Sequence, residues 1–497
     1  MNKSLESNVA KLLSSRVATQ AISFVTAPII ARLYLPEYFG IRQIFMSLSS
    51  LIIVVSCLRY ELSIPLGKDK REAITGFVLS LIFTSFFSLL SLVLVLFLRK
   101  KIALWFKTPE LSNFLWLFPI VVFLGGLGMA LRYYASREGK FSTIAWVDFS
   151  VAFSSNIIIL TWALIFGSSA VGLFFGYIAG IVFGILLFFI FLIRKLLYDI
   201  KNADLNINAI LTTLKIHRKF PIFETWSGLL GSISPQLPVI IFGLYYSSTI
   251  VGYYSFGYRI VLLPMTLLGS SISEVFFPTA AKHYNEAGNL SSLVSTMYKR
   301  LVQLSVFPMV GFGFLGASLF GFMFGEKWVE AGIYAQILSG FVLMNTISSP
   351  LGSTIIILKK QEMALFFNVI VTVIRVITLL LGAQTGQPRM ALALLVIFNI
   401  IAISSVLVWV LNRSGVSIGW SVKIFFKYLM ISSLLLLPAG CLAWFSSNIF
   451  MVLLTSGGAA LVYLFGLFWF EPGFRDYKFN ALITRLFAQW NKKKPSP

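Results

Sequence analysis

The sequence predicts an all-α polytopic membrane protein with about 14 transmembrane helices. Of its 497 residues, 58% are hydrophobic and only 12% are charged, whereas soluble proteins carry about 25% charged residues. The mean hydropathy is +0.88. Apolar stretches recur along the whole chain and are apolar nearly all round, without the alternation typical of a membrane barrel, which favours helices.

A spanning helix needs about 20 mostly apolar residues. At that length the chain divides into fourteen segments, separated by charged breaks and by breaks rich in glycine, proline and asparagine. The first six expected spans cover residues 12–34, 40–60, 74–98, 113–133, 141–164 and 169–193. The next six cover residues 221–244, 250–272, 301–324, 331–357, 363–383 and 390–411, and a final pair covers 424–446 and 449–470.

The longest polar connection follows the sixth span and divides the chain into two six-helix halves. Each half has an even number of spans, so both halves have the same orientation, and any repeat between them is parallel. The segments APIIARLYLPEYFGIRQIF, from Ala27, and LPVIIFGLYYSSTIVGYYSF, from Leu237, share a proline, a Leu-Tyr pair and a glycine. The expected regions are an N-lobe (1–193), a linker (194–220), a C-lobe (221–411), an extra helix pair (412–470) and a basic tail (471–497).

Lysine and arginine are distributed unequally between alternate loops. One side receives 29 of the 40 basic residues, the other receives 8, and three arginines fall inside spans. Because basic loops stay in the cytoplasm, both termini are expected there. The main exception is the outer group of Arg99, Lys100, Lys101 and Lys107. The net charge of +22 is therefore interpreted as an orientation signal, and not as a nucleic-acid site.

Two polar connections are expected to form helices on the cytoplasmic surface. In the tail, apolar residues from Phe479 to Trp490 recur at helical spacing and are followed by Lys492, Lys493 and Lys494, a pattern typical of a membrane-surface anchor. The linker has a similar pattern between Leu205 and Leu214. Its simplest interpretation is a tether between the halves.

The sequence lacks the residue patterns that several classes of chemistry require. The two cysteines and two histidines are scattered, which predicts neither a disulfide framework nor a metal site. The chain has no GxxxxGK[ST] phosphate loop, no G-x-S-x-G elbow and no H-E-x-x-H helix, and no cofactor is indicated. The predicted outer loops are short, which argues for transport over an enzyme that acts on lipid-linked sugars.

Arginines inside the predicted spans are the first candidates for a binding site. Arg259 and Arg375 lie about nine and twelve residues into their spans, which at 1.5 Å per residue places both near mid-membrane. Such charges usually face a cavity, a partner or a pathway. Arg16 lies about one turn inside the first span, where it is equally suited to a cavity or to cytoplasmic headgroups.

Three acids are also embedded, and two interpretations of them stay open. Asp148, Glu224 and Glu274 could each neutralise an arginine, for example Glu224 with Arg259, and serve packing only. Alternatively, Glu224 or Asp148 exchanges a proton while the arginines hold an anion.

Prolines inside spans give a second pointer to function. Pro28 lies in the first span, Pro235 and Pro238 in the seventh, Pro264 in the eighth and Pro350 in the tenth, and each is expected to kink or break its helix. The first and seventh spans occupy matching positions in the two halves. Paired interrupted helices are typical of a transport site between repeats, although proline is also common in membrane helices.

Four segments resemble polysaccharide exporters of the multidrug/oligosaccharidyl-lipid/polysaccharide (MOP) superfamily, in particular O-antigen flippases of the Wzx type. They are SSRVATQAISFVTAPIIARLYLPEYFGIRQIF, CLRYELSIPLGKDKREA, HRKFPIFETWSGLLGSISPQLPVIIFG and VGYYSFGYRIVLLPMTLLGSSISEVFFPTAAK. The resemblance implies two lobes around a cationic central cavity in the bacterial cytoplasmic (inner) membrane. It implies that the protein moves an undecaprenyl-pyrophosphate-linked oligosaccharide to the periplasmic leaflet by alternating access.

The resemblance also assigns residues and partners. Arg16, Arg59, Glu61 and Arg259 match residues of the family's segments, whereas Glu224 stands where relatives carry serine or threonine. A polysaccharide polymerase, a chain-length regulator and a coupling proton or sodium ion are candidate partners. The alternatives are a cation-coupled multidrug exporter of the same superfamily, a membrane polymerase or ligase of lipid-linked sugars, and a scaffold that transports nothing.

Overall fold

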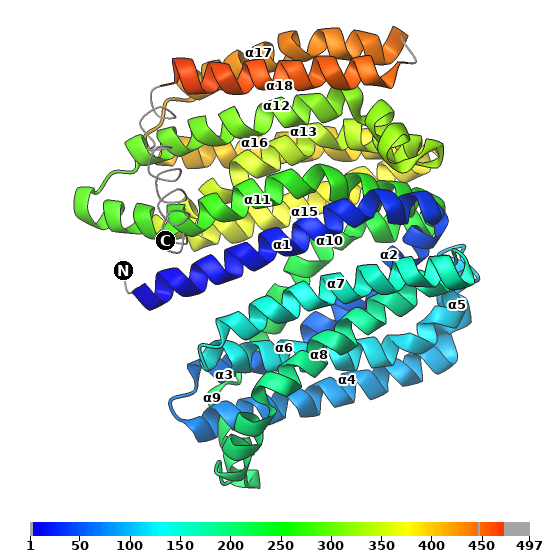
Figure 1. Cartoon of the computed structure of the whole chain (residues 1–497). Helices are drawn as coiled ribbons and strands as arrows, with labels where there is room; N and C mark the ends of the chain where they lie inside the picture. Colours follow the sequence, from blue (N-terminus) through cyan, green and yellow to red (C-terminus); the bar gives the residue numbers. More distant parts are fainter. Residues whose placement is uncertain (1–2, 446–447, 472–497) are drawn as a thin grey trace, which may run out of the picture.

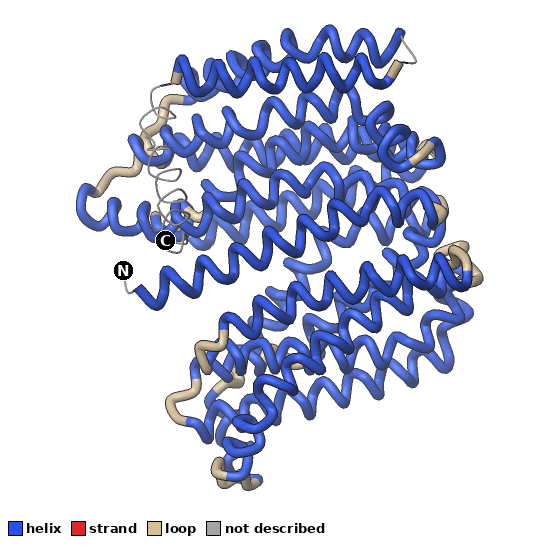
Figure 2. Tube along the Cα trace, in the orientation of Figure 1, coloured by secondary structure: helices blue, strands red, loops and turns tan. Residues whose placement is uncertain are grey.

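The computed structural model describes residues 3–445 and 448–471, and this part of the chain is helical without strands (Figure 2). The long helices of the first half are α1 (Lys3–Leu33), α2 (Pro36–Ser56), α4 (Lys70–Trp105), α6 (Phe118–Arg137), α7 (Phe141–Phe166) and α8 (Ala170–Lys201). Those of the second half are α10 (Thr225–Tyr245), α11 (Ser248–Ala287), α12 (Ser291–Phe324), α13 (Val329–Gly352), α15 (Gln361–Gln384) and α16 (Pro388–Arg413), followed by α17 (Ile418–Phe445) and α18 (Ile449–Phe470).

Short elements connect the long helices. They are η1 (Tyr60–Leu62), α3 (Ser63–Leu66), α5 (Leu111–Phe114), η2 (Leu115–Leu117), α9 (Ile207–Ile216), the π-turn η3 (Phe220–Glu224), η4 (Glu326–Trp328) and α14 (Thr354–Ile357). Helix α9 is the helix expected in the linker. The amphipathic helix expected in the tail lies outside the described residues.

The fold class predicted from the sequence is confirmed, whereas the count of 14 spans stays a prediction. Within the described residues, 12 helices are long and apolar enough to cross a membrane. Helices α1 and α11 are the other two long helices, and α1 contributes a shorter apolar stretch, Val17–Leu33.

Several helices are longer than the predicted spans. Helix α4 has 36 residues, which corresponds to about 54 Å, whereas the hydrocarbon core is about 30 Å thick. The predicted ends followed the first charged residues. A helix continues past them because its hydrogen bonds do not require apolar side chains outside the membrane.

The helices form two bundles joined along α1, α2, α10 and α11 (Figure 1). In the first, α2 packs against α4, α6 and α8, and α7 packs between α1 and α8. In the second, α13 packs against α11, α12 and α16, while α17 and α18 cover α12. We call the side on which α1 begins the near side, and the side on which α1 ends and α2 begins the far side.

A hydrophobic cluster joins the two bundles towards the far side. It includes Ile41 and Phe45 of α2, Phe242 of α10 and Tyr254 of α11, all of them buried. A second cluster, around Phe77, Tyr134 and related residues, lies within the first bundle alone. The shared core therefore connects the bundles by the far ends of α2, α10 and α11.

The prolines lie within continuous helices, so the expected breaks are not seen, whereas the expected kinks stay a prediction. Pro28, Pro235, Pro238 and Pro264 all lie inside continuous helices, as does Pro350. A proline lacks the N–H that would bond to the carbonyl four residues earlier. A membrane helix tolerates this loss where neighbouring groups satisfy that carbonyl, as the next section describes for Pro238.

Candidate functional site

Helices α2 and α11 cross at two glycines on the far side. A Cβ atom added to Gly40 would lie 2.5 Å from the carbonyl carbon of Ser248, and one added to Gly252 would lie 2.8 Å from that of Pro36. The contact is reciprocal, as expected across a two-fold axis. The two glycines also occupy matching places in the repeat found in the sequence. The two backbones therefore touch here, with no room for a side chain.

The end of α1 is also fastened on the far side. The last carbonyls of a helix have no partner within the helix, and here the Trp328 indole donates to the Ala31 carbonyl at 2.7 Å and the Lys327 ammonium donates to the Arg32 carbonyl at 2.9 Å. The Arg32 guanidinium donates to the carbonyls of Phe322 (2.6 Å) and Met323 (3.1 Å). These bonds tie α1 to the connection between α12 and α13.

Two arginines lie on the neighbouring helices α2 and α11, on the near side of the glycine crossing. Arg42 follows Gly40 by two residues on α2, and Arg259 follows Gly252 by seven residues, or about 10 Å, on α11. Their positive charges are close enough to repel each other. Neither has an ion pair or a hydrogen-bond acceptor within the described residues, and the Nε atom of Arg42 is buried without a partner. The side chain of Arg259 is exposed.

Arg59 and Glu61 lie together at the near end of α2. Arg59 has a left-handed backbone (φ 62°), and its Nη1 lies 3.4 Å from Oε1 of Glu61. A Cβ on Gly228 would lie 2.8 Å from Nη2 of Arg59, so this guanidinium rests against α10 of the other bundle. Glu61 is fully buried, and burial raises the pKa of its carboxyl group. Its second oxygen has no hydrogen-bond partner within the described residues.

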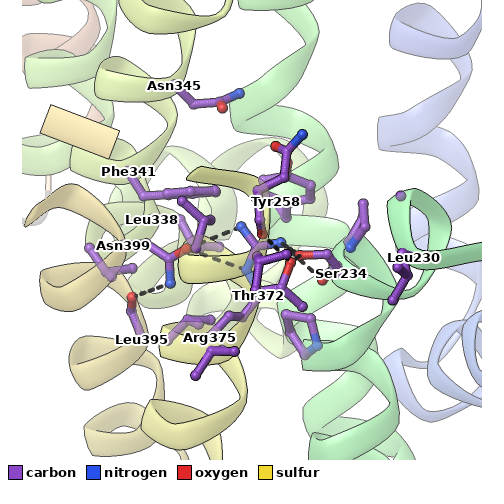
Figure 3. Close-up of a pocket in the computed structure, with 18 of the residues that line it drawn as sticks. Leu230, Ser234, Tyr258, Leu338, Phe341, Asn345, Thr372, Arg375, Leu395 and Asn399 are labelled. Atoms are coloured by element: carbon purple, nitrogen blue, oxygen red, sulfur yellow. Dashed lines mark hydrogen bonds between the residues drawn. The ribbon is translucent and has the colours of Figure 1, made fainter. Parts of the chain in front are cut away.

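Arg375 differs from Arg42 and Arg259 because protein groups occupy most of its donors. Its Nη1 donates to the backbone carbonyl and the hydroxyl of Ser234, each at 2.9 Å. Its Nε and Nη2 donate to Oδ1 of Asn399 at 3.3 and 3.1 Å. The Ser234 carbonyl is the one that Pro238 leaves without a helical donor. Arg375 therefore repairs the proline defect in α10 and joins α10, α15 and α16 (Figure 3).

A cavity of about 710 Å³ surrounds Arg375 within the second bundle. Its volume is that of a typical small-molecule site. Tyr258, Phe341 and Asn345 reach it from α11 and α13 (Figure 3), and Asn368 and Thr372 from α15. In the described structure the side chains of Asn345 and Asn368 have no protein hydrogen-bond partner, and neither is fully buried. Arg375 is the single charged residue in this lining.

Asp148 and Glu224 form no contact with the arginine pair within the described residues. Asp148 accepts two hydrogen bonds from Arg132 of α6, at 2.6 and 2.9 Å. Glu224 is exposed and forms no ion pair with Arg259 or with any other described residue. Arg16 and Glu274 lie on α1 and α11, but their side chains are outside the described part.

Arg42, Arg132 and the polar lining of the cavity are functional candidates that the sequence alone does not single out. Arg42 lies at the start of its expected span (40–60), where its position in the sequence does not separate it from the basic residues of a loop. A sequence pattern does indicate part of this lining, because Asn368, Thr372 and Arg375 recur at helical spacing on one face of an apolar helix. No group of three or more metal-ligating side chains occurs among the described residues.

Residues 29–333 match a family described as polysaccharide biosynthesis proteins. The chain is 24% identical over 194 residues to the teichuronic acid biosynthesis protein TuaB of Bacillus subtilis, a match that spans 39% of each chain. It is 20% identical over 375 residues to an uncharacterized membrane protein in the cps region of Klebsiella pneumoniae, spanning 75% of each. It is 22% identical over 169 residues to the lipopolysaccharide biosynthesis protein WzxC of Escherichia coli, which is 33% of this chain and 34% of WzxC.

Two solved structures share the fold. The lipid II flippase MurJ superposes with a TM-score of 0.72 at 17% identity, covering 93% of this chain and 99% of MurJ. A multidrug resistance MATE family transporter of the MOP superfamily superposes with a TM-score of 0.61 at 16% identity, covering 80% of this chain and 94% of the transporter. These similarities confirm the predicted fold class.

Proposed function

Because this chain belongs to the polysaccharide biosynthesis protein family, we propose that it is a flippase for a lipid-linked oligosaccharide. The substrate is an undecaprenyl-pyrophosphate-linked repeat unit of a surface polysaccharide such as O-antigen. The names of TuaB and WzxC, which refer to teichuronic acid and lipopolysaccharide biosynthesis, support this class of cargo. The protein crosses the bacterial cytoplasmic membrane, and its near side faces the cytoplasm.

The observation on which the proposal chiefly rests is the unneutralised arginine pair, Arg42 and Arg259. A pyrophosphate needs fixed positive charge in a wet cavity, and a guanidinium stays ionised there and offers bidentate donors. A hydrogen bond to a charged group contributes about 1.5–3 kcal/mol. The free donors of both arginines are therefore available to the anion, whereas those of Arg375 are largely occupied.

The closed glycine crossing supports transport by alternating access. Gly40 and Gly252 allow the backbones of α2 and α11 to touch towards the far side, and the arginine pair lies on the near side of that contact. The lipid enters from the cytoplasmic leaflet with its pyrophosphate between the lobes, while the polyprenyl tail stays in lipid. Separation of α2 from α11 then opens the site to the periplasm.

Coupling to a proton or sodium ion belongs to the same proposal. Glu61 is suited to carry a proton because it is buried beside Arg59, at a contact between the lobes. A polysaccharide polymerase and a chain-length regulator are the proteins that would receive the flipped unit.

A gene deletion in the native host tests this function. We expect a complete oligosaccharide on undecaprenyl pyrophosphate to accumulate in the cytoplasmic leaflet, detected in lipid extracts and with a leaflet-specific probe. Accumulation of the unpolymerised unit in the periplasmic leaflet would instead identify an enzyme. An unchanged lipid pool would favour a multidrug exporter or a scaffold.

Complementation of this deletion with variants tests the arginine pair. Arg259→Ala and Arg42→Ala should each abolish transport, and Arg259→Lys should restore part of it because lysine keeps the charge but not the bidentate geometry. Arg194→Ala is the matched control, since Arg194 is exposed on α8. Wild-type transport by well-expressed Arg259→Ala would contradict the assignment.

A further inference from the structure

The cavity around Arg375 is separate from the arginine pair, although the two are neighbours on α11. Tyr258 lines the cavity and Arg259 follows it directly, about 100° further around the helix. Neither Arg42 nor Arg259 belongs to the lining. A molecule whose charged end lay between the lobes could therefore place an adjoining group in this cavity.

We propose that this cavity binds the sugars next to the pyrophosphate, that it is built for uncharged sugars rich in hydroxyl or N-acetyl groups, and that Arg375 positions its walls without binding the pyrophosphate. The inference rests on the proposed function, because it takes the cargo to be a glycosylated lipid. It adds a second subsite, which binds uncharged groups, whereas the arginine pair binds the anionic pyrophosphate.

The free amides fit a neutral sugar. Asn345 and Asn368 lie on two different helices, and each offers two N–H donors and a carbonyl acceptor that no described group uses. Sugar hydroxyl groups both donate and accept, so they match this mixed set. A lining for a phosphate would instead provide donors alone.

The aromatic residues fit the other surface of a sugar. Tyr258 and Phe341 reach the same cavity (Figure 3). An aromatic ring offers a broad apolar face, against which the C–H face of a pyranose can pack. Amides that bond to the hydroxyl groups at the edge of a pyranose and aromatic rings that pack against its C–H face together match a sugar better than an apolar drug or a lipid tail.

The bonds of Arg375 indicate a positioning residue. A guanidinium has five N–H donors, and all three nitrogens of Arg375 are engaged, making four hydrogen bonds to Ser234 and Asn399. Its side chain is also held over the ring of Phe341, 5.9 Å from the centroid. Too few donors remain for bidentate binding of an anion. The guanidinium instead fixes the wall from which Asn368 and Phe341 project.

A binding ratio tests this inference. The probes are undecaprenyl pyrophosphate and the same lipid carrying the host oligosaccharide, each titrated against the full chain in lipid nanodiscs. We expect wild-type protein to prefer the glycosylated lipid. Asn345→Ala and Asn368→Ala should each reduce this preference about fivefold, which is the change in affinity expected when one neutral hydrogen bond is lost. Both variants should leave the affinity for undecaprenyl pyrophosphate unchanged. Asn412→Ala, an exposed residue near the end of α16, is the control.

Arg375→Lys distinguishes positioning from direct binding. Lysine keeps the charge but cannot reach the acceptors on both α10 and α16, so the preference for the glycosylated lipid should fall while binding of undecaprenyl pyrophosphate persists. A parallel loss for both lipids would overturn the positioning role. An unchanged preference in both asparagine variants would overturn the sugar subsite. If the wild-type protein bound neither lipid, the proposed function itself would fail.

Discussion

Substitution of Gly40 by alanine should shift the protein towards a state open on the far side. The added Cβ would lie 2.5 Å from the carbonyl carbon of Ser248, whereas carbon atoms in contact normally lie about 3.5–4.0 Å apart. The carbonyl oxygen of Ser248 lies nearer still to the added Cβ, so helices α2 and α11 must separate by more than about 1 Å at the crossing. Backbone atoms form this contact, so no side chain can rotate away to relieve it.

The size of the shift follows from the cost of overpacking. Inserting a methyl group into a packed interior costs about 1–3 kcal/mol, and this cost falls on the far-closed state alone. A change of 1.4 kcal/mol is tenfold in an equilibrium, so the ratio of open to closed protein should rise about 5-fold to 150-fold. Gly252→Ala should act in the same direction because the contact is reciprocal.

Thiol labelling from the far side of the membrane measures this shift. A single cysteine at Ser255, which is partly buried on α11, is introduced after replacement of Cys57 and Cys441, the two free cysteines. A charged thiol reagent should label it at least about five times faster in the Gly40→Ala background. Gly128→Ala is the matched control, since a Cβ at Gly128 meets no atom within 4 Å. Equal labelling rates in the two backgrounds would refute the reasoning.

Two further predictions concern stability. Burial raises the pKa of Glu471, but hydrogen bonds from Lys299 and Tyr428 outweigh burial and hold the pKa below its ordinary value. The ionised carboxylate therefore stabilises the fold above about pH 4.3, and this stabilisation is lost as the pH falls through the folded-state pKa. Glu471→Gln should therefore lower the thermal unfolding temperature at pH 7 and have a smaller effect below about pH 4; an equal effect at both values would contradict it. Trp328→Phe, which removes the donor to the Ala31 carbonyl, should cost about 1–3 kcal/mol because it leaves a buried acceptor unpaired; unchanged thermal unfolding would contradict it.

Much of the architecture could be predicted from the sequence because it depends on local physics. Length and apolarity predict membrane helices, and the repeat of proline, Leu-Tyr and glycine placed Gly40 and Gly252 in equivalent positions. Helix ends were less predictable. The start of α4 at Lys70 and the end of α8 at Lys201 lie beyond the predicted spans, where composition no longer constrains the helix.

The roles of the arginines could not be predicted from the sequence. Arg259 and Arg375 look alike there, as single charges in apolar spans. They differ in the acceptors around them, and the acceptor for Arg375 exists because Pro238, far away in the sequence, frees a carbonyl on α10. Arg42 was missed because its depth depends on where α2 begins. The partner of Asp148 is Arg132 on the preceding helix, and not an arginine of the C-lobe.

Flipping by the purified protein is the most direct test of the proposed function. The full chain is reconstituted into liposomes that contain undecaprenyl-pyrophosphate-linked oligosaccharide, and a membrane-impermeant reagent then measures how much of the sugar moves between leaflets. We expect movement with the wild-type protein and with Arg194→Ala, and none with Arg259→Ala or Arg42→Ala. Movement that is equal in all four proteins, or absent from the wild type while the lipid binds, would contradict the role of the arginine pair in transport.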